Sequence, residues 1–244
     1  NAVSGGYMQE LFHNFRGLES LVQQEYDKAF GIINGIDTEV WNPETDAFLE
    51  FNFNKNNALE GKWKNKKELC EEYQLNPDLP LFSFIGRFAG EKGADLLPEI
   101  VRKSIQETNG SLNVMILGSG DKNIENQLSD LKNTYTNFAL DLGYKEYLSH
   151  KIYASSDFLL MPSRVEPCGL NQMYAMRYGT VPIVRYIGGL RDTVEDISTG
   201  GSGINFGNAT AEDTVNAMKR ALHIYHEQGL MDQLVYSNMG FNFS

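Results

Sequence analysis

From residue 81 onward, short apolar runs alternate with helical stripes. The runs predict strands at 81–85, 112–117, 137–142, 158–161, 181–184 and 203–206. Between them, apolar residues recur at intervals of three and four, which predicts helices. Residues 147–155 are also predicted to be helical. The clearest helical stripes are Leu97/Ile100/Val101/Ile105, Ile124/Leu128/Leu131 and Val215/Met218/Leu222/Tyr225. This alternation predicts a doubly wound, mostly parallel, Rossmann-like α/β sheet with helices on both faces.

The first 80 residues are less regular. A helix is predicted over residues 17–26, where Leu18, Leu21 and Val22 share one face, and another over residues 62–73. A short strand is predicted over residues 30–33, closed by a turn dipeptide. Residues 36–57 are rich in Asn, Asp, Thr and Pro and show no clear period, so we expect a long surface segment or hinge there.

Composition excludes several classes of protein. The chain of 244 residues fits one large α/β domain or one domain with attached pieces, and 41% hydrophobic residues suffice for a packed core. A net charge of −11, from 21 basic and 32 acidic residues, disfavours a general nucleic-acid or anionic-membrane surface. No apolar run approaches the ~20 residues of a membrane span. Two cysteines, Cys70 and Cys168, provide no disulfide framework and suggest a reducing compartment.

A carboxylate and a predicted anion-binding turn follow the strand at 158–161. Glu166 and Pro167 are predicted to open a helix, because proline is favoured at the first helical position. Gly169 would let a ligand approach the first turn, where free N–H groups favour a phosphate. Open α/β sheets bind ligands at this carboxyl edge. Glu166 could alternatively be only a favourable charge near a helix dipole.

Three glycine-containing loops, at residues 86–93, 118–120 and 188–190, should reach the same edge of the sheet. None is a Walker motif or a GxGxxG fingerprint, and glycine commonly just closes a strand–helix turn. The first loop carries Arg87 and Lys92, two cations that would suit a diphosphate gaining charge as a bond breaks. The alternative is two solvated charges.

Other candidate residues are more ambiguous. Tyr144 follows a predicted strand, and its ring could stack on a base or sugar or simply pack. Cys168 is interpreted as a packed small residue, because nothing nearby in the sequence supplies a base. The four histidines form no metal-ligand pattern with cysteine, so no metal is expected.

Several motifs in combination resemble the bacterial and plant starch and glycogen synthases. They are SRVEPCGLNQ (163–172), YGTVPIV (178–184) and GGLRDTV (188–194). NGID (34–37) and WNPETD (41–46) are similar to the hinge-region motif of that family, and GRFAGEKG (86–93) to its phosphate-binding loop. Many other retaining glycosyltransferases carry a second Glu eight positions after the first, whereas this chain has Tyr174 there, as the synthases do.

The resemblance implies two Rossmann-like domains facing each other across a cleft, the GT-B arrangement. Such enzymes transfer glucose from ADP-glucose to the non-reducing end of an α-1,4-glucan, with retention and without a metal or other cofactor. Residues 36–244 would form the second, nucleotide-binding domain, and residues 1–35 a remnant of the first domain and hinge. The Lys-x-Gly-Gly-Leu motif, a glucose-contacting histidine and the final helix of the family are absent from this sequence.

The sequence is accordingly interpreted as a fragment of a cytoplasmic enzyme (plastidial in a plant) that is inactive alone. By resemblance, Arg87 and Lys92 would hold the diphosphate and stabilise the departing ADP, and Glu166 would contact the donor glucose. The expected substrate-binding residues are Tyr144 against the adenine, Cys168, the backbone N–H groups around Gly169, Leu170 and Asn171 at the phosphate, and Gly188 and Gly189 along the donor pocket.

Two alternatives stay open at this point. The chain could belong to a glycosyltransferase that uses another donor, such as UDP-glucose. It could also be a non-catalytic nucleotide- or glucan-binding module, in which the aromatic segment 48–53 would be either a sugar platform or simple packing.

Overall fold

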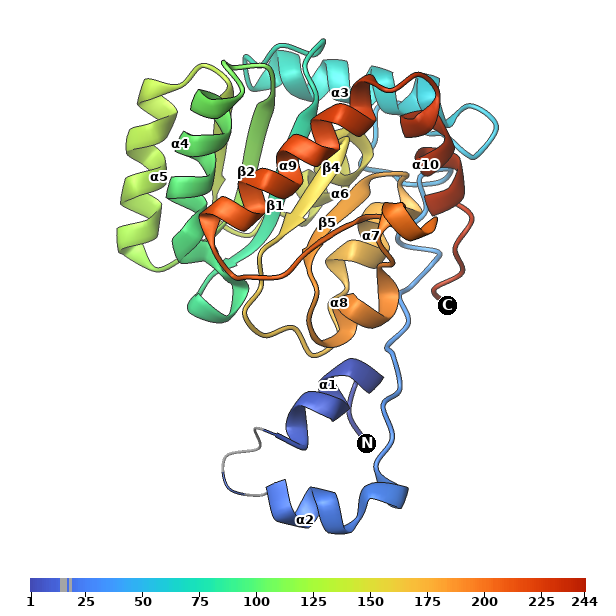
Figure 1. Ribbon diagram of the computed structural model, residues 1–244. Coiled ribbons are helices and arrows are strands. Elements are labelled where there is room, and N and C mark those ends of the chain that lie inside the picture. Colours follow the sequence, from blue (N-terminus) through green and yellow to red (C-terminus); the bar gives the residue numbers. More distant parts are fainter. Residues whose placement is uncertain (14–16, 18) are drawn as a thin grey trace.

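A six-stranded parallel sheet forms the centre of the computed structural model, which describes residues 1–244 except 14–16 and 18 (Figure 1). The strands are β1 (Leu81–Phe88), β2 (Asn113–Gly120), β3 (Phe138–Leu142), β4 (Phe158–Met161), β5 (Val181–Arg185) and β6 (Ile204–Phe206). Their order is β3-β2-β1-β4-β5-β6, and every neighbouring pair is parallel. The predicted doubly wound α/β fold is confirmed.

Helices cover both faces of this sheet. They are α3 (Ala58–Glu72), α4 (Leu97–Glu107), α5 (Lys122–Thr134), α6 (Glu146–Ser155), α7 (Asn171–Arg177), α8 (Gly188–Thr193), α9 (Ala211–His226) and α10 (Leu230–Asn238). Helices α4, α5 and α9 pack together on one face, while α3 contacts α6 on the other (Figure 1). The winding direction reverses between the neighbouring strands β1 and β4, and ligands of doubly wound sheets bind at such a point.

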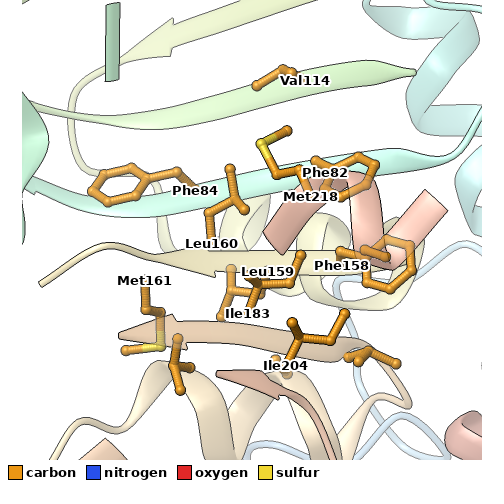
Figure 2. Close-up of a cluster of buried hydrophobic side chains, with 14 of the residues drawn as sticks. Phe82, Phe84, Val114, Phe158, Leu159, Leu160, Met161, Ile183, Ile204 and Met218 are labelled. Carbon is orange, nitrogen blue, oxygen red and sulfur yellow. The ribbon is translucent and has the colours of Figure 1, made fainter. Parts of the chain in front are cut away.

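The apolar runs of the sequence form the core of the sheet. Figure 2 shows side chains from successive strands gathered with Met218 of α9. Phe82 of β1 and Phe158 of β4 are register partners, and their rings stack with centroids 4.8 Å apart. Both are fully buried, and burying such a side chain contributes about 1.5–3 kcal/mol. This packing fixes β1 beside β4 at the switch point.

A buried lysine joins α3 to the rest of this domain. The Lys62 ammonium has three N–H donors and lies within hydrogen-bond distance of four oxygens: the carbonyls of Ala154, Ser156 and Tyr178, at 3.1, 2.9 and 3.1 Å, and the Thr180 hydroxyl at 2.9 Å. Burial lowers the pKa of Lys62 to about 7. One side chain therefore ties the end of α6 to the segment that precedes β5.

The amino-terminal segment differs partly from expectation. It contains α1 (Gly5–Leu11) and α2 (Glu19–Gln24), followed by a 3-10 turn, so the predicted helix over 17–26 is confirmed in part; Leu18 lies outside the described residues. The strand predicted over 30–33 is wrong. Only Gly31 pairs, in a single bridge to Ala2, and Phe30 and Ile32 are more than half exposed, so no apolar face supports a strand.

Two further regions also differ from expectation. Residues 36–57 contain no helix or strand, as predicted, yet Leu49 and Phe53 are buried in the core. Helix α10 was not predicted from the sequence, and its Leu234 and Val235 pack into the same core. In the part of the chain that the structure describes, no helix has the length and apolar character needed to cross a membrane.

Candidate functional site

Strand β1 is longer than its apolar run and carries Gly86 and Arg87 within it. The predicted loop therefore begins only after Phe88. The pairing extends because glycines face each other: a Cβ on Gly118 of β2 would lie 2.0 Å from the Gly86 carbonyl oxygen. The backbones of β1 and β2 therefore stay closely paired up to the carboxyl edge of the sheet.

Glu166 lies on an irregular loop, residues 162–170, and the predicted helix start at Glu166 and Pro167 is wrong. Helix α7 begins at Asn171. Gly169 has φ +74°, a left-handed conformation that interrupts a right-handed helix. The Arg164 and Val165 N–H groups also donate to the Glu91 carbonyl, at 2.8 and 3.1 Å, which ties this loop to the one after β1.

The structure brings together two residues predicted to be catalytic. The Lys92 ammonium lies 2.6 Å from Glu166 Oε2, and the Ser163 hydroxyl donates to the same oxygen at 3.1 Å. Glu166 is buried, with 4% of its surface exposed. Gly93 (φ +67°) makes this approach possible, because a Cβ there would lie 2.1 Å from the Pro162 carbonyl oxygen. The pair is a buried carboxylate neutralised by a cation.

A pocket of about 320 Å³ opens at the carboxyl ends of β1, β2 and β3. Its lining includes the predicted residues Arg87, Tyr144 and Asn171, together with Trp41 and Tyr174. The Arg87 guanidinium is exposed and pairs with Glu91 at 2.9 Å, and Tyr144 is 86% exposed. Asn171 donates its side-chain amide to the Ile85 carbonyl at 2.7 Å. The pocket therefore has aromatic walls and a cation at its rim.

The other predicted residues lie close to the backbone of the loop that carries Glu166. The Gly189 N–H donates to the Glu166 carbonyl at 3.0 Å, and a Cβ on Gly189 would lie 2.3 Å from the Cys168 carbonyl oxygen. A Cβ on Gly188 would lie 2.1 Å from the Glu166 carbonyl oxygen. Leu170 is the residue before α7. Burial raises the pKa of the Cys168 thiol, which favours a packed, protonated side chain. The predicted ligand-binding roles of these residues and of Gly169 stay predictions.

Sequence reasoning missed Trp41 as a site residue. Its ring stacks between Tyr174, at a centroid distance of 3.9 Å, and His150, at 3.8 Å. The sequence signal was present: Trp41 begins the WNPETD motif, which was assigned only to the hinge. Because Trp41 comes from the irregular segment before α3, this segment forms part of the pocket wall.

Asp46 anchors that segment to the domain. Its Oδ2 accepts from the Tyr178 hydroxyl at 2.5 Å and from His150 Nδ1 at 2.7 Å, and Oδ1 accepts from the Phe48 N–H at 2.9 Å. Burial by itself raises the pKa of Asp46, but the hydrogen bonds from His150, Tyr178 and Phe48 together hold it below its ordinary value of 3.8. The ionised form is thus the stabilised one.

We expect the Asp46→Ala variant to lose about 2–3 kcal/mol of unfolding free energy at pH 7, since hydrogen bonds to a charged group are worth about 1.5–3 kcal/mol. A carboxyl group with a lowered pKa in the folded state stabilises above its unfolded pKa and loses this contribution as pH falls. The difference between parent and variant should therefore shrink below about pH 4. Urea unfolding between pH 3 and 7 measures it, with the exposed Asp130→Ala as control; a constant difference would contradict this account.

Comparison with known proteins identifies the family. The family model for glycosyl transferases group 1 matches residues 65–234. The chain belongs to the group 1 glycosyltransferases. It is 50% identical over 227 residues to a glycogen synthase of Flavobacterium johnsoniae, covering 93% of this chain and 48% of the relative. It is 39% identical to a glycogen synthase of Bacillus cereus (strain Q1), covering 100% of this chain and 52% of the relative.

Solved structures agree with the assignment of this chain to the group 1 glycosyltransferases. The catalytic domain of starch synthase IV from Arabidopsis thaliana, bound to ADP and acarbose, matches with a TM-score of 0.89 and 36% identity, over 100% of this chain and 52% of that one. A glycosyltransferase from Rickettsia africae, 17% identical with a TM-score of 0.68, supports the fold alone. The resemblance to starch and glycogen synthases is confirmed, and the chain spans about half the length of these relatives.

The described residues of this glycosyltransferase contain no group of three His, Cys, Asp or Glu side chains placed to hold a metal ion. Reaction without a metal or other cofactor stays a prediction. Among the described residues, Lys92 against Glu166 and Arg87 at the pocket rim contribute charge to the site.

Proposed function

We propose that this chain is the donor-nucleotide-binding domain of a glycogen or starch synthase that uses ADP-glucose. The observation that carries the proposal is the pair of half-buried Lys92 and buried Glu166, which lies with an aromatic pocket at the carboxyl edge of the sheet. The ADP bound in the structure of starch synthase IV, to which this chain is 36% identical, supports a nucleotide as a ligand of this domain.

Each group has a task that follows from its position. The adenine would lie against Tyr144 within the aromatic wall, and the diphosphate would reach Arg87 at the rim. Lys92 would contribute positive charge where the leaving ADP gains negative charge, and such stabilisation is usually the largest catalytic term. Glu166 would face the donor glucose and stabilise positive charge developing at its anomeric carbon.

The division of the chain supports a shared cleft. We propose that residues 1–35 belong to the first domain and the hinge, and residues 36–244 to the donor domain. Helices α1 and α2 lie outside the layers of the sheet (Figure 1). The α-glucan acceptor would then bind between the two domains, and this chain alone would bind ADP weakly and synthesise no glucan.

Calorimetric titration of this chain with ADP and with UDP tests the donor. We expect tighter binding of ADP, and a Tyr144→Ala variant should lose about tenfold in affinity, because stacking of a base on an aromatic ring is worth about 1–3 kcal/mol. Tyr147→Ala is the matched control, since Tyr147 is a half-exposed tyrosine on α6 outside the pocket lining.

Three results would contradict the proposal. Tighter binding of UDP would favour another nucleotide sugar, and binding of neither nucleotide would favour a non-catalytic module. Glucan synthesis by this chain alone would contradict the shared cleft.

A further inference from the structure

Helix α1 and helix α8 cap each other, although they are about 180 residues apart in the sequence. The Gly188 N–H, the first of α8, donates to Glu10 Oε1 of α1 at 2.7 Å. The Gly6 N–H, in the first turn of α1, donates to Asp192 Oδ2 of α8 at 2.7 Å. Each helix thus supplies a carboxylate to the unpaired N–H groups and positive dipole end of the other.

Further contacts hold the two segments together. The Ser4 hydroxyl donates to the Pro167 carbonyl at 2.5 Å, within the loop that carries Glu166, and Arg191 donates to the Gln9 side chain at 2.8 Å. The backbones nearly touch, because a Cβ on Gly6 would lie 2.3 Å from the Gly188 carbonyl oxygen. This is a close, directional contact, and α1 lies directly below α8 in Figure 1.

The α8 end of this contact, Gly188 and Gly189, packs against the backbone of Glu166. Gly188 has φ +47°, and a Cβ there would lie 2.1 Å from the Glu166 carbonyl oxygen. The next N–H, that of Gly189, donates to this same carbonyl oxygen. A shift of the Gly188–Gly189 backbone would therefore move the backbone of Glu166, and with it the carboxylate that faces Lys92.

We propose that Glu10 is a positioning residue for Glu166. Its carboxylate fixes the Gly188–Gly189 backbone, and this backbone fixes Glu166 against Lys92. The inference rests on the proposed synthase function, because it assigns Glu10 a role in placing a group that acts on the donor glucose. It assigns to residues 1–35 a direct effect on catalysis in the other domain.

The test compares Glu10→Ala and Glu10→Gln in the full-length enzyme that contains this chain. Glu10→Ala should lower kcat for glucose transfer about tenfold and leave KM for ADP-glucose within about twofold, because small displacements of catalytic groups are costly and the nucleotide pocket lies elsewhere. Glu10→Gln keeps an oxygen acceptor and should recover most of kcat. Glu25→Gln is the control, since Glu25 is an exposed carboxylate paired with Lys28.

Amide hydrogen exchange in the same full-length protein provides a readout independent of activity. Glu10→Ala should speed exchange at Gly188 and Gly189, while the melting temperature stays within a few degrees of the parent. Unchanged kcat in an active parent background, or equal losses in Glu10→Ala and Glu10→Gln, would overturn the inference. If the parent transfers no glucose from ADP-glucose, the proposed function fails. In that case, unchanged amide exchange at Gly188 and Gly189 in Glu10→Ala would separately overturn the inference.

Discussion

Replacing Lys92 by alanine in the full-length enzyme is expected to lower kcat/KM for the donor by tenfold or more. The ammonium of Lys92 is 2.6 Å from Glu166 Oε2, and this carboxylate is almost completely buried. Removal of this ammonium leaves the buried carboxylate with the Ser163 hydroxyl as a hydrogen-bond donor, and under the proposed function it also removes positive charge from beside the leaving diphosphate. A charge-assisted contact is worth about 1.5–3 kcal/mol, which corresponds to about ten- to a hundredfold. Steady-state kinetics with varied ADP-glucose measure the effect.

The control for this experiment is Lys103→Ala. Lys103 lies on α4 and faces Glu99 at 3.8 Å, away from the site, so its removal should change kcat/KM less than twofold. A Lys92→Ala enzyme with parental kinetics would exclude Lys92 from the reaction. Equal losses in the two variants would point to a general effect of lost charge.

Replacing Lys62 by alanine is expected to destabilise the domain by about 3–5 kcal/mol. Three backbone carbonyls lose their charged donor, and each unsatisfied buried group costs about 1–3 kcal/mol, in addition to the space left by the side chain. This is a large part of a typical total of 5–15 kcal/mol. Urea unfolding followed by circular dichroism measures the loss. Lys64→Ala, on the exposed side of the same helix, should change stability by less than about 0.5 kcal/mol.

The pH dependence separates the charge of Lys62 from its packing. Its pKa is about 7 in the folded protein and about 10.5 in the unfolded chain, so the unfolded chain binds more protons between these values. The parent should therefore gain stability relative to Lys62→Met as pH rises from 7 towards 10. A difference that does not vary with pH would show that Lys62 does not titrate in this range.

The sequence predicted those parts of the fold that depend on local apolar patterns. All six strands were found because each is a short buried run, and β4 was found with its exact bounds, Phe158–Met161. The bounds of β1 were missed because its last three residues, Gly86 to Phe88, pair through close backbone approach to β2 and carry no apolar pattern. The strand at 30–33 failed for the opposite reason: it has the apolar pattern, but in the described residues it pairs only through a single bridge, from Gly31 to Ala2.

The candidate site was predictable in its residues but not in its geometry. Glu166 and Lys92 are 74 residues apart. Both could be placed at one edge of the sheet because each lies in a glycine-containing segment that follows a predicted strand. The sequence could not show that the loop of Glu166 is held open by N–H groups donating to Glu91, so a helix was expected there. Trp41 was missed because its motif, WNPETD, was assigned only to the hinge, and the local sequence does not show that its ring stacks between two side chains more than 100 residues away.

The position of Lys62 in the chain also sets an order of events during synthesis. Its four hydrogen-bond partners are encoded 92 to 118 residues later. At about 5–20 residues per second, the ribosome delivers them roughly 5–24 s after the lysine. During that interval α3 has no buried place for its ammonium, which stays hydrated. The carboxyl-terminal half of the sheet therefore cannot close over α3 until Thr180 has been made, and a chain interrupted before that residue would retain an open, unfinished domain.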